Sequence, residues 1–298
     1  MTDVPLRTEM LMGTLVTIHV VPPGADLAVE RAFGWFREIE RRCTRFDEGS
    51  ELMQLSTHVG VPVPASAILC EAVRFALSVA EDTGGAFDPT VGRRMEARGF
   101  DREHRTGQTV RSSFRHDDGV TYRDVHVDPD RRTITLDRAL TLDLGAVAKG
   151  LAVDAAAREL LPFRDFAIDA GGDLYLGGCN PDGVPWSIGI RHPRLDGQLI
   201  DSLWASDKAV CTSGDYERPS RNDAREHHVL DPRSGVSPDA VASATVVAPS
   251  AMLADALGTA AFVLGPVEGI KLFERHGVQG LIVTPALERY ATLDLHAE

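Results

Sequence analysis

Hydrophobic positions alternate with polar ones in several short segments of the chain and recur at helical spacing in others. Residues 14–21 alternate and are β-branched, which predicts a strand that ends at Pro22-Pro23-Gly24. Apolar residues recur every three or four positions between Val29 and Ile39 and again over 67–82, which predicts two helices. Further helices are expected over 146–161, from an N-cap at Ser250 to a stop at Gly265, and over about 267–275.

Short strands are the commoner prediction in the rest of the chain. They are expected at 120–127, 132–137, 165–169, 186–190, 199–205, 209–213, 227–230, 242–248 and 280–284. Because they outnumber the helices and often come in adjacent pairs, we expect an α+β fold with mixed, largely antiparallel sheets and packed helices. Segments 44–60 and 93–118 are expected to be irregular, the second as a long surface loop. A chain of 298 residues can form one domain, 1–298, or two closely packed lobes.

The composition of the chain bears mainly on which classes of partner and which cellular locations it excludes. The net charge of −13 argues against nucleic acid. The four cysteines form no C-x-x-C pair, which is typical of buried thiols in a reducing compartment. Asp3, Arg7 and Glu9 interrupt the N-terminus, and no 18-residue apolar stretch exists. We therefore expect a cytoplasmic protein that does not span a membrane.

Two helices carry candidate chemistry. Lys149 falls in the first turn of the helix that follows Gly145, where a positive charge opposes the helix dipole unless an anionic ligand binds there. A solvent-facing lysine is the slightly favoured alternative on this segment alone. Asp255 and Thr259 are four residues apart on the 250–265 helix, on the face opposite Leu257. Two hard oxygen ligands one turn apart suit Mg²⁺, although a plain polar solvent face is the commoner explanation.

Three turns carry further candidates. His227 and His228 precede a turn from Asp231 to Gly235, where a histidine can transfer protons or simply cap the turn. The pair Gly171-Gly172 joins two strands and allows either a close backbone approach to a flat or anionic ligand or a tight hairpin. The segment 211–218, which contains Ser213, has the same character.

Eight segments, taken in order, resemble the FAD:protein FMN transferase family, also called the ApbE family. They are MGTLVTI (12–18), RFDEGSELMQL (45–55), FDPTVG (87–92), LDLGAVAKG (142–150), DAGGDLYLGG (169–178), CTSGDYER (211–218), HHVLDPRSG (227–235) and ADALGTAAFVLG (254–265). The resemblance implies an α+β fold that binds FAD in a cleft, with Mg²⁺ on the FAD phosphates. It also implies metal ligands at Asp255, Thr259 and the backbone carbonyl of Ala146.

The resemblance further implies the reaction. FAD donates FMN through a phosphoester to a threonine or serine hydroxyl of an acceptor protein, and AMP leaves. His228 is the expected general base, with Asp255 as the other catalytic candidate. Contact with FAD is implied for Met12, Ser56, Asp88, Lys149, Gly171, Gly172, Ser213 and His228.

The sequence also departs from the family pattern. Many family members are exported lipoproteins, but this sequence shows no such export signal. Ser56 stands where the family often has asparagine. The family also commonly has asparagine near Ala170, before the paired glycines. Two alternatives to transfer therefore stay open. One is an FAD pyrophosphatase that gives FMN and AMP, and the other is a flavin-binding protein without chemistry.

Overall fold

The structure is a computed structural model that describes residues 6–102, 106–111, 116–217 and 226–295. The chain divides into two compact units. The large-sheet unit comprises Met1–Arg37, Lys149–Glu217 and Asp239–Glu298, and the small-sheet unit comprises Glu38–Ala148 and Arg218–Pro238. Helices α1 (Asp26–Cys43) and α5 (Gly145–Leu160) each contribute residues to both units.

The large-sheet unit is built on an antiparallel sheet. Among the described residues its strand order is β1-β2-β6-β7-β10-β11-β12-β13. The strands are β1 (Leu6–Leu11), β2 (Thr14–Val20), β6 (Phe166–Ala170), β7 (Asp173–Gly177), β10 (Lys208–Gly214), β11 (Ser243–Ala248), β12 (Gln279–Val283) and β13 (Arg289–Ala291). Antiparallel pairing throughout confirms the α+β class.

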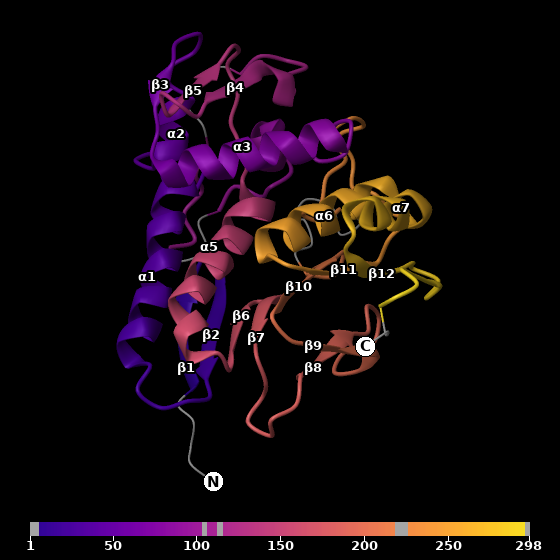
Figure 1. The fold of residues 1–298 in the computed structure, drawn as a ribbon. Helices are drawn as coiled ribbons and strands as arrows, with labels where there is room; N and C mark the ends of the chain where they lie inside the picture. The colour runs from indigo at the N-terminus through magenta and orange to yellow at the C-terminus, as the bar shows by residue number, and fades with distance from the viewer. Residues whose placement is uncertain (1–5, 103–105, 112–115, 218–225, 296–298) are drawn as a thin grey trace. The chain divides into compact units, whose positions relative to one another are not determined.

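The centre of this sheet is covered on both faces. Every residue of β11 is buried, because helix α6 (Ala251–Leu264) packs on one face of β10 and β11. On the other face, the hairpin of β8 (Trp186–Arg191) and β9 (Leu199–Ala205) forms an apolar cluster that includes Leu203, Val247 and Val283. Helix α7 (Pro266–His276) packs against α6 and β12 (Figure 1), and a short 3-10 helix, η3 (Leu161–Phe163), follows α5.

Capping fixes the ends of α6. The Ser250 side chain accepts a hydrogen bond from the N–H of Leu253, which confirms the predicted N-cap. The helix ends at Gly265, whose φ of 84° is accessible to glycine at little cost, and Pro266 begins α7. Because α6 is apolar almost all round, it is a buried helix and not an amphipathic surface helix.

The small-sheet unit combines short helices with the strand order β3-β5-β4. Its strands are β3 (Val63–Pro64), β4 (Val125–Asp128) and β5 (Thr133–Leu136). Its helices are the C-terminal part of α1, α2 (Glu51–Leu55), α3 (Ala67–Asp82) and α4 (Gly92–Ala97), with the 3-10 helices η1 (Pro89–Val91) and η2 (Tyr122–Asp124). Helix α3 covers the predicted range, and the predicted helices 29–39, 146–161, 250–265 and 267–275 correspond to α1, α5, α6 and α7.

Several local predictions were wrong. Segment 44–60 contains α2, whose Leu52, Met53 and Leu55 are buried under a Ser50 cap. Segment 93–118 begins with α4, and among its described residues Arg98, Asp101 and His116 are buried, so these parts are not a solvated loop. The predicted strand 280–284 is confirmed as β12, and a further short strand, β13, follows it among the described residues. No helix of the described residues is long and apolar enough to cross a membrane.

The strand predicted at 227–230 was also wrong. His228 lies in a bend, and no strand forms there. The backbone N–H of His227 donates to Ser237 Oγ, which in turn donates to the His227 carbonyl. His227 forms a single β-bridge position only, and these side-chain bonds hold its backbone in the turn without a continuous strand.

Candidate functional site

Three of the family-like segments meet at one end of the large sheet. The turn Met12-Gly13 joins β1 to β2, and Gly171-Gly172 joins β6 to β7. The register pairs Val16 with Ala170, so both turns lie at the same end of the sheet. Cys211 of β10 pairs with Asp173, which brings the C-terminal half of β10, with the buried Ser213, to that end as well.

The two turns depend on left-handed backbone. Met12 has a φ of 50°, and Gly171 and Gly172 have φ values of 66° and 96°. A Cβ on Gly171 would lie 2.0 Å from Thr14 Oγ1, whereas one on Gly172 would meet nothing within 4 Å. The structure thus shows a tight hairpin turn at Gly171. Space for a ligand to approach exists at Gly172, and such an approach remains a prediction.

Asp255 is buried, so the solvent-face explanation was wrong for this residue. It lies on α6 with 8% of its surface exposed, and Thr259, one turn later, is half-buried. At the intervening Gly258, where α6 packs on β10 and β11, a Cβ would sit 3.5 Å from Ser213 Oγ, which is an ordinary contact distance. Burial, and then the negative charge of Asp255, raises the pKa of the Cys211 thiol well above its usual range.

Lys149 is not the solvent-facing lysine that the sequence slightly favoured. Its side chain is 17% exposed and forms an ion pair with Asp173, which is 2% exposed. Asp173 is the first residue of β7 and follows the glycine pair directly. The sequence offered one signal for Asp173, its place in the family-like segment 169–178. Asp173 therefore fixes the position of the lysine at the turn end of the sheet.

Asp154 and Gly150 fix α5 against the start of α6. Asp154 Oδ1 and Oδ2 accept hydrogen bonds from the N–H groups of Ala251 (2.7 Å) and Met252 (3.0 Å). Burial raises the pKa of Asp154, against the effect of these two bonds. A Cβ on Gly150 would lie 2.5 Å from Met252 Cα. Sequence analysis missed both residues, because their partners lie about a hundred positions away.

In the small-sheet unit, Asp88 and Ser56 have structural roles. Asp88 caps η1, accepting from the Thr90 N–H (2.9 Å), the Thr90 hydroxyl (2.7 Å) and the Tyr122 N–H (3.0 Å). Burial raises the pKa of Asp88 despite these bonds. Ser56 is buried at the C-cap of α2. Contact between either side chain and FAD remains a prediction.

The two histidines differ in their surroundings. His227 is buried, with Nδ1 accepting from the Val229 N–H (3.3 Å), so its Nε2 donates to the Pro238 carbonyl (3.0 Å). His228 is half-buried, and its ring centroid lies 6.4 Å from that of His227 at an interplanar angle of 70°. His227 is thus the histidine that caps the turn, and His228 remains the candidate for proton transfer.

Ala146 interrupts the first turn of α5. Its φ and ψ of −92° and 16° are not helical, and they fall in the sparsely populated region where many functional residues lie. The preceding Asp143 accepts a hydrogen bond from the Gly145 N–H (2.8 Å). Gly145 itself has no positive φ; instead, a Cβ there would lie 3.0 Å from Asp143 Oδ1.

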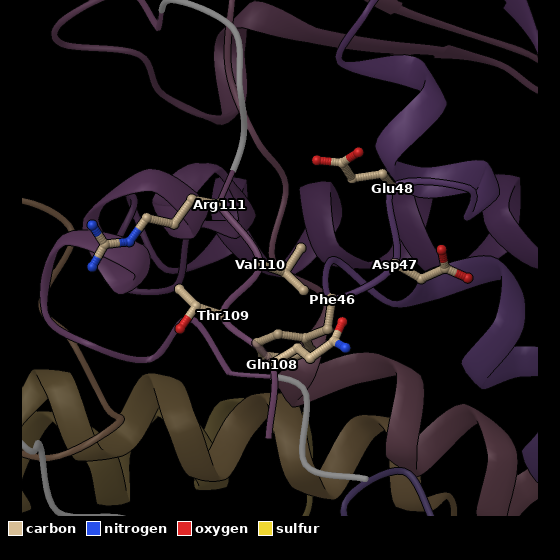
Figure 2. A pocket seen from close by; sticks show the side chains of 7 residues that line it. All are labelled: Phe46, Asp47, Glu48, Gln108, Thr109, Val110 and Arg111. Atoms are coloured by element: carbon tan, nitrogen blue, oxygen red, sulfur yellow. The ribbon is translucent and has the colours of Figure 1, made fainter. Parts of the chain in front are cut away.

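The small-sheet unit also contains a cavity of about 560 Å³. Two segments line it, 46–48 from a family-like motif and 108–111, which the sequence left uninterpreted. Figure 2 shows the side chains of Phe46, Gln108 and Val110 close together, with the charged ends of Glu48 and Arg111 directed away from them. Arg111 donates to Asp101 Oδ2 (2.6 Å).

Comparisons with known proteins agree over nearly the whole chain. The model of the ApbE family matches residues 12–282. The FAD:protein FMN transferase of Treponema pallidum is 33% identical over 94% of this chain and 84% of that protein. The enzyme of the same name from Haemophilus influenzae is 28% identical over 90% of this chain and 82% of that protein.

Solved structures are similar as well. The crystal structure of the ApbE protein from Thermotoga maritima has a TM-score of 0.87 and 31% identity, covering 99% of this chain and 100% of that chain. The flavin transferase ApbE from Vibrio cholerae has a TM-score of 0.84 and 26% identity, covering 98% of each chain. On the extent of the family match and the identity to these relatives, the chain belongs to the ApbE family.

Proposed function

We propose that the protein is an FAD:protein FMN transferase, which moves FMN from FAD onto a threonine or serine hydroxyl of an acceptor protein and releases AMP. The relatives that it matches over most of their length carry that name. The observation that carries the proposal is the burial of Asp255 on α6, in the same unit as the Lys149–Asp173 ion pair. Buried charged groups are costly and cluster at functional sites.

Magnesium fits the donors that α6 provides. Asp255 and Thr259 offer a carboxylate and a hydroxyl oxygen one helical turn apart, and both are hard ligands of the kind Mg²⁺ prefers. The described residues contain no group of three or more His, Cys, Asp or Glu side chains placed to hold a metal. Further ligands would therefore be carbonyl, phosphate or water oxygens, as is usual for Mg²⁺. The proposal includes the Ala146 carbonyl.

Bound Mg²⁺ would supply charge stabilisation at the FAD phosphates. In this proposal Lys149 brings a second positive charge to the anionic ligand, and its ion pair with Asp173 supports that role by holding the lysine in position. The acceptor hydroxyl attacks the FMN phosphorus, the bond from that phosphorus to the bridging oxygen breaks, and AMP leaves with the oxygen. His228 takes the hydroxyl proton, which is the role of a general base.

Hydrolysis of FAD by the same machinery is the second candidate. Ser56 stands where the family often has asparagine, and the structure buries it at the end of α2. A smaller side chain at a buried position can leave room for water. We expect slow release of FMN and AMP when no acceptor is present, with transfer as the main activity.

The test is to incubate the protein with FAD and Mg²⁺, with and without a polypeptide that carries a candidate threonine or serine. AMP release is measured together with in-gel flavin fluorescence of the polypeptide. Transfer predicts covalent flavin and AMP in equal amounts. Rapid AMP release with no covalent flavin on any acceptor would support the pyrophosphatase. FAD binding with neither product would support a flavin-binding protein.

A further inference from the structure

The small-sheet unit contains a buried arginine that links two family-like segments, 45–55 and 142–150. Arg45 is 5% exposed and follows the end of α1. Its Nε donates to Asp143 Oδ2 (2.7 Å), and its Nη2 donates to the Phe100 carbonyl (2.5 Å). Its guanidinium also lies 4.2 Å from the ring centroid of Phe46, which lines the cavity in Figure 2. The guanidinium is therefore held from several sides.

Asp143 connects Arg45 to the start of α5. Its Oδ2 binds Arg45, while its Oδ1 accepts the Gly145 N–H at 2.8 Å. Its own N–H donates to the Pro89 carbonyl at 2.7 Å, within the FDPTVG segment. One carboxylate thus links the arginine to the backbone immediately before Ala146. A carboxylate oriented by arginine on one oxygen presents its other oxygen in a fixed direction.

The backbone at Ala146 shows what this constraint achieves. A helical residue has a ψ near −42°, whereas Ala146 has a ψ of 16°, so its carbonyl is rotated by roughly 60° from the helical direction. The Leu144 carbonyl accepts from both Val147 and Ala148, so the regular helix begins around this residue. The turn therefore directs the Ala146 carbonyl away from the line of the other carbonyls.

Stability alone does not explain Arg45. Its Nη1 is buried and has no hydrogen-bond partner among the described residues. Replacing a buried ion pair by apolar side chains of similar volume is often neutral or stabilising, so stability is a weak reason for a buried arginine with an unused donor. The arginine gives instead a planar, fixed donor geometry that neither methionine nor lysine reproduces.

We propose that Arg45 is a positioning residue that acts through Asp143 to hold the Gly145–Ala146 turn, and so the direction of the Ala146 carbonyl. The proposal rests on the proposed function, which assigns that carbonyl to Mg²⁺. Residues that orient a metal ligand without touching the metal typically change metal affinity by about 10–100-fold when they are replaced.

The experiment compares Arg45→Met, Arg45→Lys and Asp143→Asn with the wild type. The control is Arg42→Met, which removes another arginine of the same unit, one that pairs with Glu38 and Glu51 and does not contact Asp143. The readouts are the Mg²⁺ concentration for half-maximal AMP release, kcat at saturating Mg²⁺, the melting temperature, and hydrogen exchange of the Gly145 amide without Mg²⁺ or FAD.

Arg45→Met is expected to raise the half-maximal Mg²⁺ concentration about 10-fold or more, with much of kcat recovered at high Mg²⁺. Gly145 exchange should be faster in Arg45→Met and Asp143→Asn and unchanged in Arg42→Met. The half-maximal Mg²⁺ concentration of Arg45→Lys should fall between those of Arg45→Met and the wild type, because lysine keeps the positive charge but lacks the planar, forked donors of a guanidinium. If Arg45→Met does not fold, Asp143→Asn carries the same comparison.

An Arg45→Met protein that loses stability as Arg42→Met does, with the same half-maximal Mg²⁺ concentration as that control, would overturn the proposal. The exchange measurement separates this failure from a failure of the proposed function. If the wild type releases no AMP at any Mg²⁺ concentration, the proposed function fails. Faster Gly145 exchange in the variants would then still support the positioning of the turn, and unchanged exchange would overturn it.

Discussion

The two units hold their candidate residues in different ways. In the large-sheet unit, Lys149, Asp173 and Asp255 sit on α5, β7 and α6, and backbone ladders fix their positions. In the small-sheet unit, Asp88 and His228 lie in turns or caps that side chain–backbone bonds maintain. A side chain on a regular element can be removed while the backbone stays in place. In a turn, the side chain is often what keeps the backbone in place.

This difference predicts how substitutions will behave. In the large-sheet unit, a change at Asp255 should alter activity with little effect on folding. In the small-sheet unit, activity and stability should be harder to separate, except at residues that do not hold the turn themselves. The following predictions test the contrast, beginning with the largest expected effect.

Asp255→Ala should lower Mg²⁺-dependent FAD cleavage on the order of a thousand-fold, because the remaining oxygens cannot balance the phosphate and cation charges. The melting temperature should change little, because the backbone hydrogen bonds and apolar packing of α6 hold the helix without this side chain. Turnover is measured across a Mg²⁺ titration, with Thr259→Ser as the control that keeps a hydroxyl oxygen. Near-normal turnover of Asp255→Ala at limiting Mg²⁺ would mean that α6 is not the metal helix.

His228→Ala and His227→Ala should separate the two roles within one turn. His228→Ala should reduce the rate of transfer about a hundred-fold with a small change in stability, as loss of a general base does. His227→Ala should instead lower the melting temperature, because it leaves the Val229 N–H and the Pro238 carbonyl without their ring partners. Thermal unfolding and single-turnover kinetics on both variants decide the assignment. The opposite pattern would make His227 the base.

Gly150→Ala should destabilise the large-sheet unit by about 1–3 kcal/mol, the usual cost of inserting volume into a packed interior. The added Cβ would meet the backbone of Met252, which cannot rotate away as a side chain could. Gly34→Ala is a matched control, because a Cβ there meets nothing within 4 Å on α1. Denaturant unfolding of both variants measures the difference, and equal stabilities would show that α5 and α6 can separate freely.

Asp154→Asn should cost about 1 kcal/mol, since an amide can accept only one of the two N–H groups at the start of α6. The cost should also depend on pH. Burial raises the pKa of Asp154 in the folded state, so the folded protein binds this proton more tightly than the unfolded chain does. The resulting stability is fully present below the unfolded pKa of 3.8 and is lost as pH rises through the folded pKa. The deficit of Asp154→Asn should therefore be larger near pH 4 than near pH 7. Chemical unfolding at the two pH values checks the sign, and a constant deficit would show that Asp154 does not titrate with folding.

Periodicity predicted the large-sheet unit better than the small-sheet unit. Helix α6 and strand β11 follow directly from runs of apolar residues with a Ser250 cap. Helix α2, the bend at His228 and the buried Arg98 did not follow, because capping and side chain–backbone bonds decide them and such bonds leave no period in the sequence. Among the candidate residues, the family-like motifs named Lys149 and Asp255. They did not reveal that Lys149 pairs with Asp173 or that Asp255 is buried.

The sequence by itself determined the α+β class, the main helices and the order of the motifs, because these depend on local periodicity, glycine stops and residue identity. Only the tertiary structure decided which charges are buried and what they touch. Asp154 reaches Ala251, and Arg45 reaches Asp143, about a hundred residues along the chain. Such contacts are set by strand register and by close packing at glycines such as Gly150, and neither is local. The physical reason is that the free energy of a charge depends on its surroundings, which the fold alone supplies.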